Sequence, residues 1–187
     1  MAHVTLILGG ARSGKSALAE QLARASGKAV TYIATAQGGD DEMAARIAHH
    51  QARRPAAWRL VECPLALGQI LEQEAATDTL LLVDCLTLWL TNLMCQPQPP
   101  AAAALAACFA ELAEQLTALP GEVLLVSNEV GLGIVPMGAL SRRFVDEAGR
   151  LNQLLAVHAQ RVAFVAAGLP LWLKGMSPDA QKEAAHD

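Results

Sequence analysis

Short apolar runs alternate along the chain with longer segments in which apolar and polar residues are mixed. The runs lie at residues 3–8, 29–35, 58–62, 79–84, 122–126 and 161–167. Runs of this length, partly β-branched and poor in charge, are typical of strands in a buried parallel sheet. Since such strands are joined by helices that cover both faces, the pattern predicts a three-layer α/β fold with a mainly parallel sheet.

The mixed segments are expected to form helices. They cover about residues 17–25, 40–54, 64–76, 85–94, 101–119 and 139–158. Residues 169–174 suit an edge strand, where Pro170 is tolerated, and residues 176–187 resemble a polar tail that frays. We expect residues 1–187 to form a single domain, because strands of the parallel type lie on both sides of the Pro-rich break at residues 96–100.

The turn between the first strand and the first helix carries the strongest chemical signal. It fits G-x-x-x-x-G-K-[ST] and narrows the fold to the P-loop NTPase type, with a RecA-like sheet. Glycine lets several N–H groups point at one phosphate, and the helix N-terminus adds positive potential. A chance match in a glycine-rich turn is disfavoured by the flanking strand and helix. The candidate nucleotide contacts are Gly9, Gly10, Ala11, Arg12, Ser13, Gly14, Lys15 and Ser16.

Two residues of this loop and three residues at strand ends suggest individual roles. Lys15 can reach the β- and γ-phosphates, and the Ser16 hydroxyl can ligate Mg²⁺. Asp84 ends an apolar strand as a Walker B acid does, where it would hold Mg²⁺ directly or through water. Thr35 and Glu62 also end strands, where a nucleotide contact and an ordinary turn or surface role both remain open.

Two adjacent histidines fall on different faces of the helix expected near residues 40–54. His50 continues an apolar side, whereas His49 lies between Arg46 and Arg53. Arginines would bind phosphate and lower the pKa of His49, leaving a neutral, nucleophilic imidazole. On these residues alone, a solvated basic helix face is the favoured interpretation.

A long loop and two arginines follow the fifth strand. Residues 127–136 form a polar, glycine-bearing segment at the same edge as the phosphate loop, and we expect a mobile lid over a second substrate there. Arg142 and Arg143 fall in the first turn of the next helix, where cations are disfavoured unless an anion is near. A phosphate contact, within or across subunits, and a solvated pair are both open.

Composition excludes several classes of protein. A net charge of −4 argues against a sequence-independent nucleic-acid surface. The sequence contains neither a run of apolar residues long enough for stable membrane insertion nor a signal peptide, so a cytoplasmic location is expected. The four cysteines, Cys63, Cys85, Cys95 and Cys108, lack zinc-site spacing and are expected to be reduced thiols.

Several motifs occur together in one order. They are residues 9–16, Tyr32-Ile33-Ala34-Thr35, Asp40-Asp41-Glu42-Met43 with Arg46-Ile47-x-His49-His50, Arg54-Pro55 with Trp58, and Asn128-Glu129-Val130-Gly131-x-Gly133-Ile134-Val135-Pro136. In this combination the sequence resembles the bifunctional adenosylcobinamide kinase / adenosylcobinamide-phosphate guanylyltransferase family of cobalamin synthesis. The resemblance runs from residue 3 to about residue 175.

The resemblance implies two reactions. The aminopropanol hydroxyl of adenosylcobinamide attacks the γ-phosphate of ATP or GTP. GTP then transfers GMP to adenosylcobinamide phosphate through a guanylyl-histidine, releasing pyrophosphate. The resemblance assigns the nucleophile to His49, with Lys15 as the second catalytic residue, and this reverses the interpretation of His49 as a solvated side chain.

The resemblance also implies further contacts and an assembly. Mg²⁺ would be held by Ser16 and Asp84, and the protein would be a homotrimer with active sites between subunits. Beyond the phosphate loop, the implied nucleotide contacts are Ala34, Thr35, Ala36, His50, Gln51, Ala52, Arg53, Glu62 and Asp84. Two alternatives from other functional classes are a single-activity P-loop kinase of small molecules and a nucleotide-binding switch without transfer chemistry.

Overall fold

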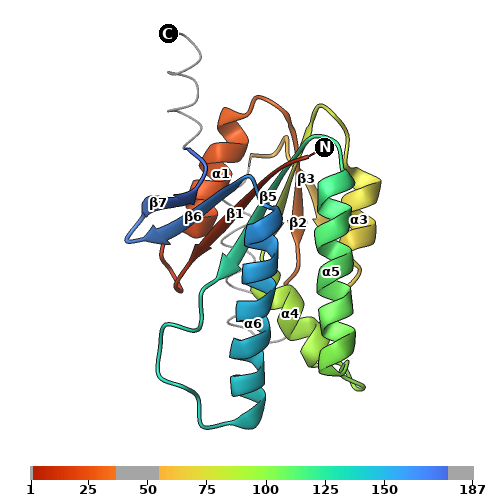
Figure 1. The fold of residues 1–187 in the computed structure, drawn as a ribbon. Helices are drawn as coiled ribbons and strands as arrows, with labels where there is room; N and C mark the ends of the chain where they lie inside the picture. Colours follow the sequence, from red (N-terminus) through yellow and green to blue (C-terminus); the bar gives the residue numbers. More distant parts are fainter. Residues whose placement is uncertain (1, 37–54, 177–187) are drawn as a thin grey trace.

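The computed structural model describes residues 2–36 and 55–176 (Figure 1). Its strands form one seven-stranded sheet in the order β3-β2-β4-β5-β1-β6-β7, in which only the β6–β7 pair is antiparallel. The expected mainly parallel sheet and the edge strand are therefore confirmed. The strands are β1 His3–Gly9, β2 Ala29–Ala34, β3 Arg59–Glu62, β4 Thr79–Asp84, β5 Glu122–Asn128, β6 Arg161–Ala166 and β7 Leu169–Lys174.

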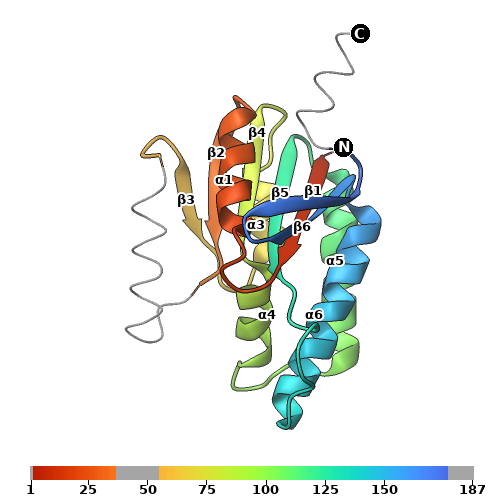
Figure 2. The same ribbon diagram turned by 90° about the vertical axis from the view of Figure 1, so that its left-hand side faces the viewer.

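Helices cover both faces of the sheet, which completes the predicted three layers. Helix α1 packs on one face, while α3, α5 and α6 lie on the other (Figures 1 and 2). The expected helix near residues 40–54 and most of the expected tail lie outside the described residues. The described helices are α1 Lys15–Ala25, α3 Leu67–Glu74, α4 Leu86–Met94, α5 Ala102–Ala118 and α6 Ala139–His158.

The sheet separates two aliphatic cores. In β1, Leu6 faces the larger core under α3 to α6, and its neighbour Ile7 faces the smaller core under α1; both are fully buried. Trp89 and Phe109 pack in the larger core with ring centroids 6.2 Å apart. Because the side chains on both faces of β1 are buried, its sequence is a continuous apolar run instead of an alternation of apolar and polar residues.

The strand order brings the candidate residues to one edge of the sheet. Strand β5 lies between β1, which leads into the phosphate loop, and β4, which ends in Asp84. Gly9 pairs with Asn128, and Asp84 pairs with Val126 on one side and Ala34 on the other. The carboxyl ends of four parallel strands thus meet where ligands bind in open α/β sheets.

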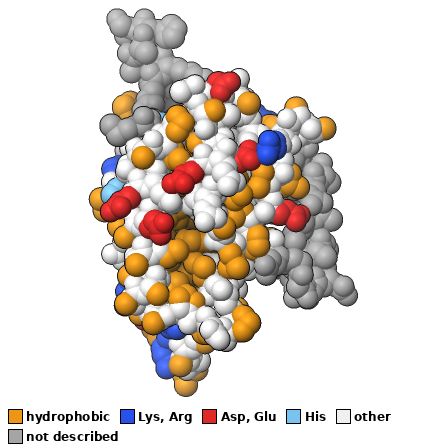
Figure 3. Space-filling view, turned by 90° about the vertical axis from the view of Figure 1, so that its right-hand side faces the viewer, with side chains coloured by type: hydrophobic (Ala, Val, Ile, Leu, Met, Phe, Trp, Pro, Cys, Tyr) orange, Lys and Arg blue, Asp and Glu red, His pale blue; other side chains and the backbone are white. Residues whose placement is uncertain are grey.

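The molecular surface on the side of α3 and α5 carries both charged and hydrophobic side chains. Figure 3 shows acidic side chains scattered among hydrophobic ones on this face. Within residues 2–36 and 55–176, none of the helices combines the length and apolar character needed to cross a bilayer.

Candidate functional site

The phosphate loop is a tight turn in which two glycines pack against neighbouring backbone. Gly14 has φ of 103° and precedes the first helical residue, Lys15. A Cβ on Gly9 would lie 2.4 Å from the Val165 carbonyl oxygen, and one on Gly14 would lie 3.0 Å from the Gly168 Cα. Space therefore requires glycine at position 9, whereas at position 14 the positive φ is the stronger reason and the close contact adds to it.

Lys15 lies folded over this loop. Its side chain is buried, and Nζ donates a hydrogen bond of 2.6 Å to the Gly10 carbonyl oxygen. Burial lowers the pKa of Lys15, and nearby Cys85 and Asp84 oppose that shift. A cation in an anion-binding turn whose one hydrogen-bond partner among the described residues is a neutral carbonyl is well placed to bind phosphate oxygens.

Ser13 supplies a second polar group that is suited to a ligand. Its Oγ is buried and has no hydrogen-bond partner among the residues that the structure describes. An unsatisfied buried hydroxyl costs about 1–3 kcal/mol. A nucleotide phosphate in the loop would remove that cost by accepting its hydrogen bond.

Asp84 is held in place at the end of β4. Its Oδ2 accepts a 2.8 Å hydrogen bond from the Tyr32 hydroxyl. The next peptide is fixed by Thr35, whose fully buried Oγ1 donates to the Cys85 carbonyl oxygen at 2.7 Å and accepts from the Cys85 N–H at 2.9 Å. The Thr35 side chain thus positions the strand end that carries Asp84.

The donor atoms at this edge suit a hard divalent cation. The Ser16 hydroxyl and the Asp84 carboxylate both offer oxygen, which Mg²⁺ prefers. Among the described residues, no three His, Cys, Asp or Glu side chains gather as a metal cage would require. Such a site would therefore depend on substrate phosphates and water for its remaining ligands, as Mg²⁺ sites of nucleotide enzymes do.

The end of β5 is tied both to the phosphate loop and to two helices. The Glu129 N–H donates to the Gly9 carbonyl oxygen at 2.9 Å. The Asn128 N–H donates to Thr87 Oγ1 at 2.7 Å, and Ser127 Oγ donates to Asn152 Oδ1 at 2.8 Å. Sequence reasoning missed Thr87 and Asn152, which are buried in the structure. In the sequence, the only signal is a polar residue among the apolar residues of each helix.

A turn far along the chain supports the phosphate loop from the other side. The Gly168 N–H, in the turn between β6 and β7, donates to the Ser13 carbonyl oxygen at 2.8 Å. Ala167 and Gly168 have positive φ of 51° and 80°. Sequence reasoning missed this support, and its only local signal is the Ala-Gly pair of a tight turn.

The remaining candidate residues fall into two groups. Ala34 and Ala36 lie at and just beyond the end of β2, and Glu62 is exposed at the end of β3, paired in register with Ala34. These three share the edge of the sheet with the phosphate loop. The other candidates lie outside the described residues; they are His49, His50, Gln51, Ala52 and Arg53.

The two arginines of α6 contact backbone carbonyls in this structure. Arg142 donates to the Pro136 carbonyl oxygen at 3.1 Å and also to that of Met137. Arg143 donates to the Pro100 carbonyl oxygen at 2.6 Å. Both side chains therefore fix loops, which is a role the sequence did not suggest.

Comparison with known proteins identifies relatives of similar length. The sequence model of the family described as cobinamide kinase / cobinamide phosphate guanyltransferase matches residues 5–173. The bifunctional adenosylcobalamin biosynthesis protein CobP of Pseudomonas aeruginosa is 61% identical over 170 residues, covering 91% of this chain and 96% of that protein. The corresponding protein CobU of Salmonella typhimurium is 43% identical over 179 residues, covering 90% and 98%.

Solved structures agree on the fold. An ATP synthase subunit, NeqB, from Nanoarcheaum equitans superposes with a TM-score of 0.56 at 16% identity, covering 98% of this chain and 56% of that one. At this identity the likeness concerns the fold alone. It agrees with the three-layer α/β architecture that the sequence predicts.

Proposed function

The chain belongs to the cobinamide kinase / cobinamide phosphate guanyltransferase family, and we propose that a single nucleotide site at the carboxyl edge of its sheet serves both transfers. In the first reaction a cobinamide hydroxyl receives the γ-phosphoryl group of ATP or GTP. In the second, GMP passes from GTP to the cobinamide phosphate, and pyrophosphate leaves. The observation that carries the proposal is a cluster around one turn: buried Lys15, fixed Asp84, and Ser13 Oγ, which has no hydrogen-bond partner within residues 2–36 and 55–176.

In the kinase step, the hydroxyl oxygen of adenosylcobinamide bonds to the γ-phosphorus while the bond from that phosphorus to the β–γ bridging oxygen breaks. ADP or GDP leaves, and the hydroxyl proton is released to water. The Lys15 ammonium can leave the Gly10 carbonyl and bind the phosphate oxygens, and the loop N–H groups hold the β-phosphate. When bound, Mg²⁺ would neutralise charge on these oxygens, with Ser16 and Asp84 as its protein ligands. The hydrogen bond from the Tyr32 hydroxyl, which fixes the Asp84 carboxylate at the end of β4, supports this role for Asp84.

For the guanylyl step, the proposed nucleophile is His49. A neutral ring nitrogen of His49 attacks the α-phosphorus of GTP, and pyrophosphate leaves. An oxygen of the cobinamide phosphate then attacks the same phosphorus, and the imidazole leaves with its electron pair. The support is the sequence context of His49, between Arg46 and Arg53, since arginines bind phosphate.

The proposal includes the nucleotide contacts outside the phosphate loop. Ala34 ends β2 beside Asp84, and Thr35 and Ala36 follow it. These residues would contact the nucleotide through backbone atoms, because the Thr35 hydroxyl is hydrogen-bonded to Cys85. Glu62 would accept hydrogen bonds from the ribose or guanine, and its exposed position at the same edge supports this. The sequence alone supports the remaining contacts, which are His50, Gln51, Ala52 and Arg53.

The decisive experiment is mass spectrometry of the protein after incubation with GTP and Mg²⁺, without any corrinoid. The wild-type protein should gain one GMP, and His49→Ala should gain none while it still phosphorylates adenosylcobinamide. His158→Ala, which removes a histidine at the far end of α6, is the matched control and should keep the adduct. An adduct on the His49 variant would overturn the assignment of the nucleophile.

We also propose the assembly and the location. Leu169, Leu171 and Leu173 on the edge strand β7 are exposed, which supports the expected homotrimer, in which part of this surface would be covered. Light scattering on the purified protein should give three times the chain mass of 19.7 kDa.

The four free cysteines support a reducing, cytoplasmic location, and cell fractionation tests it. We keep the single-domain assignment for residues 1–187 as part of the proposal.

A further inference from the structure

Residues 129–137, which we name the apolar loop, expose a concentration of large hydrophobic side chains. Ile134 is 97% exposed and Met137 is 95% exposed, while Leu132 and Val135 are 80% and 72% exposed. Large apolar side chains grouped in this way on a surface usually mark a binding site. They contribute nothing to either core of the sheet, so a role in binding accounts for their presence better than a role in folding.

The apolar loop is fixed at both ends. At its start, the Glu129 N–H donates to the Gly9 carbonyl oxygen at 2.9 Å, and Glu129 Oε1 accepts from the Gly131 N–H at 2.7 Å. At its end, the Arg142 guanidinium donates to the carbonyl oxygens of Pro136 and Met137. Both ends of the segment expected to act as a lid are therefore anchored, which shortens the stretch that must be ordered when its side chains bind a ligand.

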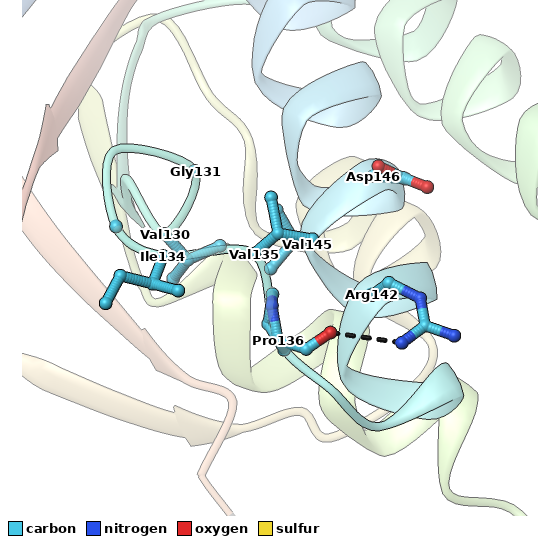
Figure 4. Close-up of a pocket in the computed structure, with 9 residues that line it drawn as sticks. Val130, Gly131, Ile134, Val135, Pro136, Arg142, Val145 and Asp146 are labelled. Atoms are coloured by element: carbon cyan, nitrogen blue, oxygen red, sulfur yellow. Dashed lines mark hydrogen bonds between the residues drawn. The ribbon is translucent and has the colours of Figure 1, made fainter.

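Between the apolar loop and α6 lies a hollow of about 110 Å³. Its walls are mixed in polarity: Val135 and Val145 face each other, while Arg142 and Asp146 add charge on the helix side (Figure 4). Pockets that enclose drug-sized ligands measure roughly 300–1,000 Å³. This hollow therefore has room for a substituent of a large ligand, whose body would lie across the exposed side chains.

The position of the apolar loop indicates which ligand it takes. It begins at Glu129, one residue after Asn128, which pairs with Gly9 of the phosphate loop. In the kinase reaction, the hydroxyl of a cobinamide side chain must reach the γ-phosphate held there. The corrin ring must then lie just beyond the edge of the sheet, within the reach of that side chain, and the apolar loop extends from this edge toward the start of α6 (Figures 1 and 2).

We propose that the apolar loop and the first turns of α6 form the binding surface for the corrin ring of adenosylcobinamide; this rests on the proposed function. A corrin has extended apolar faces and a rim of amide groups. Leu132, Ile134 and Met137 would contact an apolar face. The hollow would receive one amide-bearing substituent, with Arg142 as hydrogen-bond donor and Asp146 as acceptor.

The test is the kinetics of the double variant Ile134→Ser/Met137→Ser. Its KM for adenosylcobinamide should rise tenfold or more, since each lost apolar contact is worth up to about that factor. The KM for GTP, kcat at saturating corrinoid and the GMP adduct formed without corrinoid should be unchanged. The matched control is Val157→Ser/Leu65→Ser, which alters side chains that are 72% and 39% exposed, away from both the apolar loop and β7, and should change none of these quantities.

Two further measurements separate this proposal from its rivals. If the double variant changes the oligomeric mass in light scattering and leaves the KM for the corrinoid unchanged, the apolar loop binds a second copy of the chain and the proposal is overturned. Loss of the GMP adduct from the double variant would also overturn it, because the loop would then act on the nucleotide.

Failure of the proposed function gives a different result. A wild-type protein that forms no GMP adduct would overturn the guanylyl step alone, since the KM for adenosylcobinamide in the kinase assay still reports on this surface.

As a second variant, Asp146→Ala should raise that KM threefold or more through the loss of one hydrogen-bond acceptor, with its thermal unfolding unchanged.

Discussion

The two ends of strand β1 are built in opposite ways. At the amino end, polar groups find partners within the protein. The Arg161 guanidinium donates to Thr5 Oγ1 at 3.1 Å and to His3 Nδ1 at 3.2 Å, and the Val4 N–H donates to Gln160 Oε1 at 2.7 Å. The buried side chains of Thr5 and Arg161 at this end are therefore hydrogen-bonded within the protein.

At the carboxyl end, the polar groups are only partly satisfied. Lys15 is buried with a single carbonyl oxygen as its hydrogen-bond partner, and Ser13 Oγ has none within the part of the chain that the structure describes. Both ends belong to one strand, β1, which is only seven residues long. The difference indicates that one end of β1 contributes to stability, whereas the other keeps donors ready for phosphate at some cost to stability.

Removing the Lys15 charge should give the largest effect. Lys15→Met keeps the aliphatic stem and should lower kcat/KM of both transfers about 10²–10³-fold, as the loss of a charge-stabilising donor does. Thermal unfolding should be unchanged or slightly higher in temperature, because a desolvated cation has been removed. A variant that unfolds many degrees lower and keeps its activity would reverse the assigned roles of the two ends.

Removing the Arg161 charge should have the opposite signature. Arg161→Met leaves the buried Thr5 hydroxyl and the His3 ring without their donor, and should lower the free energy of unfolding by about 1–3 kcal/mol. The KM values for both substrates should not change. Arg59→Met is the control, since it removes an exposed ion pair with Glu74 and should cost less than about 1 kcal/mol.

Removing the Ser13 hydroxyl should separate stability from binding most cleanly. Ser13→Ala deletes a buried group without a described partner, and so should leave the free energy of unfolding unchanged or raise it by up to about 1 kcal/mol. Nucleotide affinity should fall several-fold, as measured by calorimetric titration with GTP. A destabilised variant with unaltered affinity would mean that this hydroxyl serves the fold.

The smallest effect should be a pH dependence at the amino end. Burial, and then the charge of Arg161, lower the pKa of His3 below its usual 6.5. The unfolded chain therefore binds a proton first as the pH falls below about 6.5, so stability is present above that pH and declines as the pH falls. Unfolding temperatures from about pH 7.5 to about pH 5.5 should fall less steeply in His3→Asn, which keeps an acceptor but does not titrate.

The fold was largely predictable because its signals are local. Buried parallel strands produce unbroken apolar runs, and β1, the phosphate loop and α1 follow one another directly in the sequence. Helix α3 is shorter than expected, Leu67–Glu74 in place of residues 64–76. Its Ala66 N-cap offers no side-chain hydrogen bond, and Pro64 and Leu65 form a turn before it, so the apolar spacing extends further than the helix does.

The site was predictable only in part, because much of its geometry depends on partners that are distant in sequence. The loop residues and Asp84 are recognisable from motifs. The Tyr32 hydroxyl reaches Asp84 across 52 residues, and the Thr35 hydroxyl reaches Cys85 across 50, so no local spacing reveals either contact. Sequence reasoning placed Thr35 near the nucleotide from its strand end; its side chain turns out to bond the peptide after Asp84, which only the sheet register brings within reach.

The hydrogen bond from Gly168 to Ser13 makes the last hairpin a structural part of the phosphate loop. Judged by its position at the rim of the sheet, β7 would look dispensable to anyone trimming the chain for crystallisation or fusion. Yet a cut before Gly168 would leave the Gly9–Gly14 turn without its outer brace. We expect a protein shortened in this way to fold but to bind GTP more weakly. The carboxyl boundary of an active version should therefore be placed after Lys174.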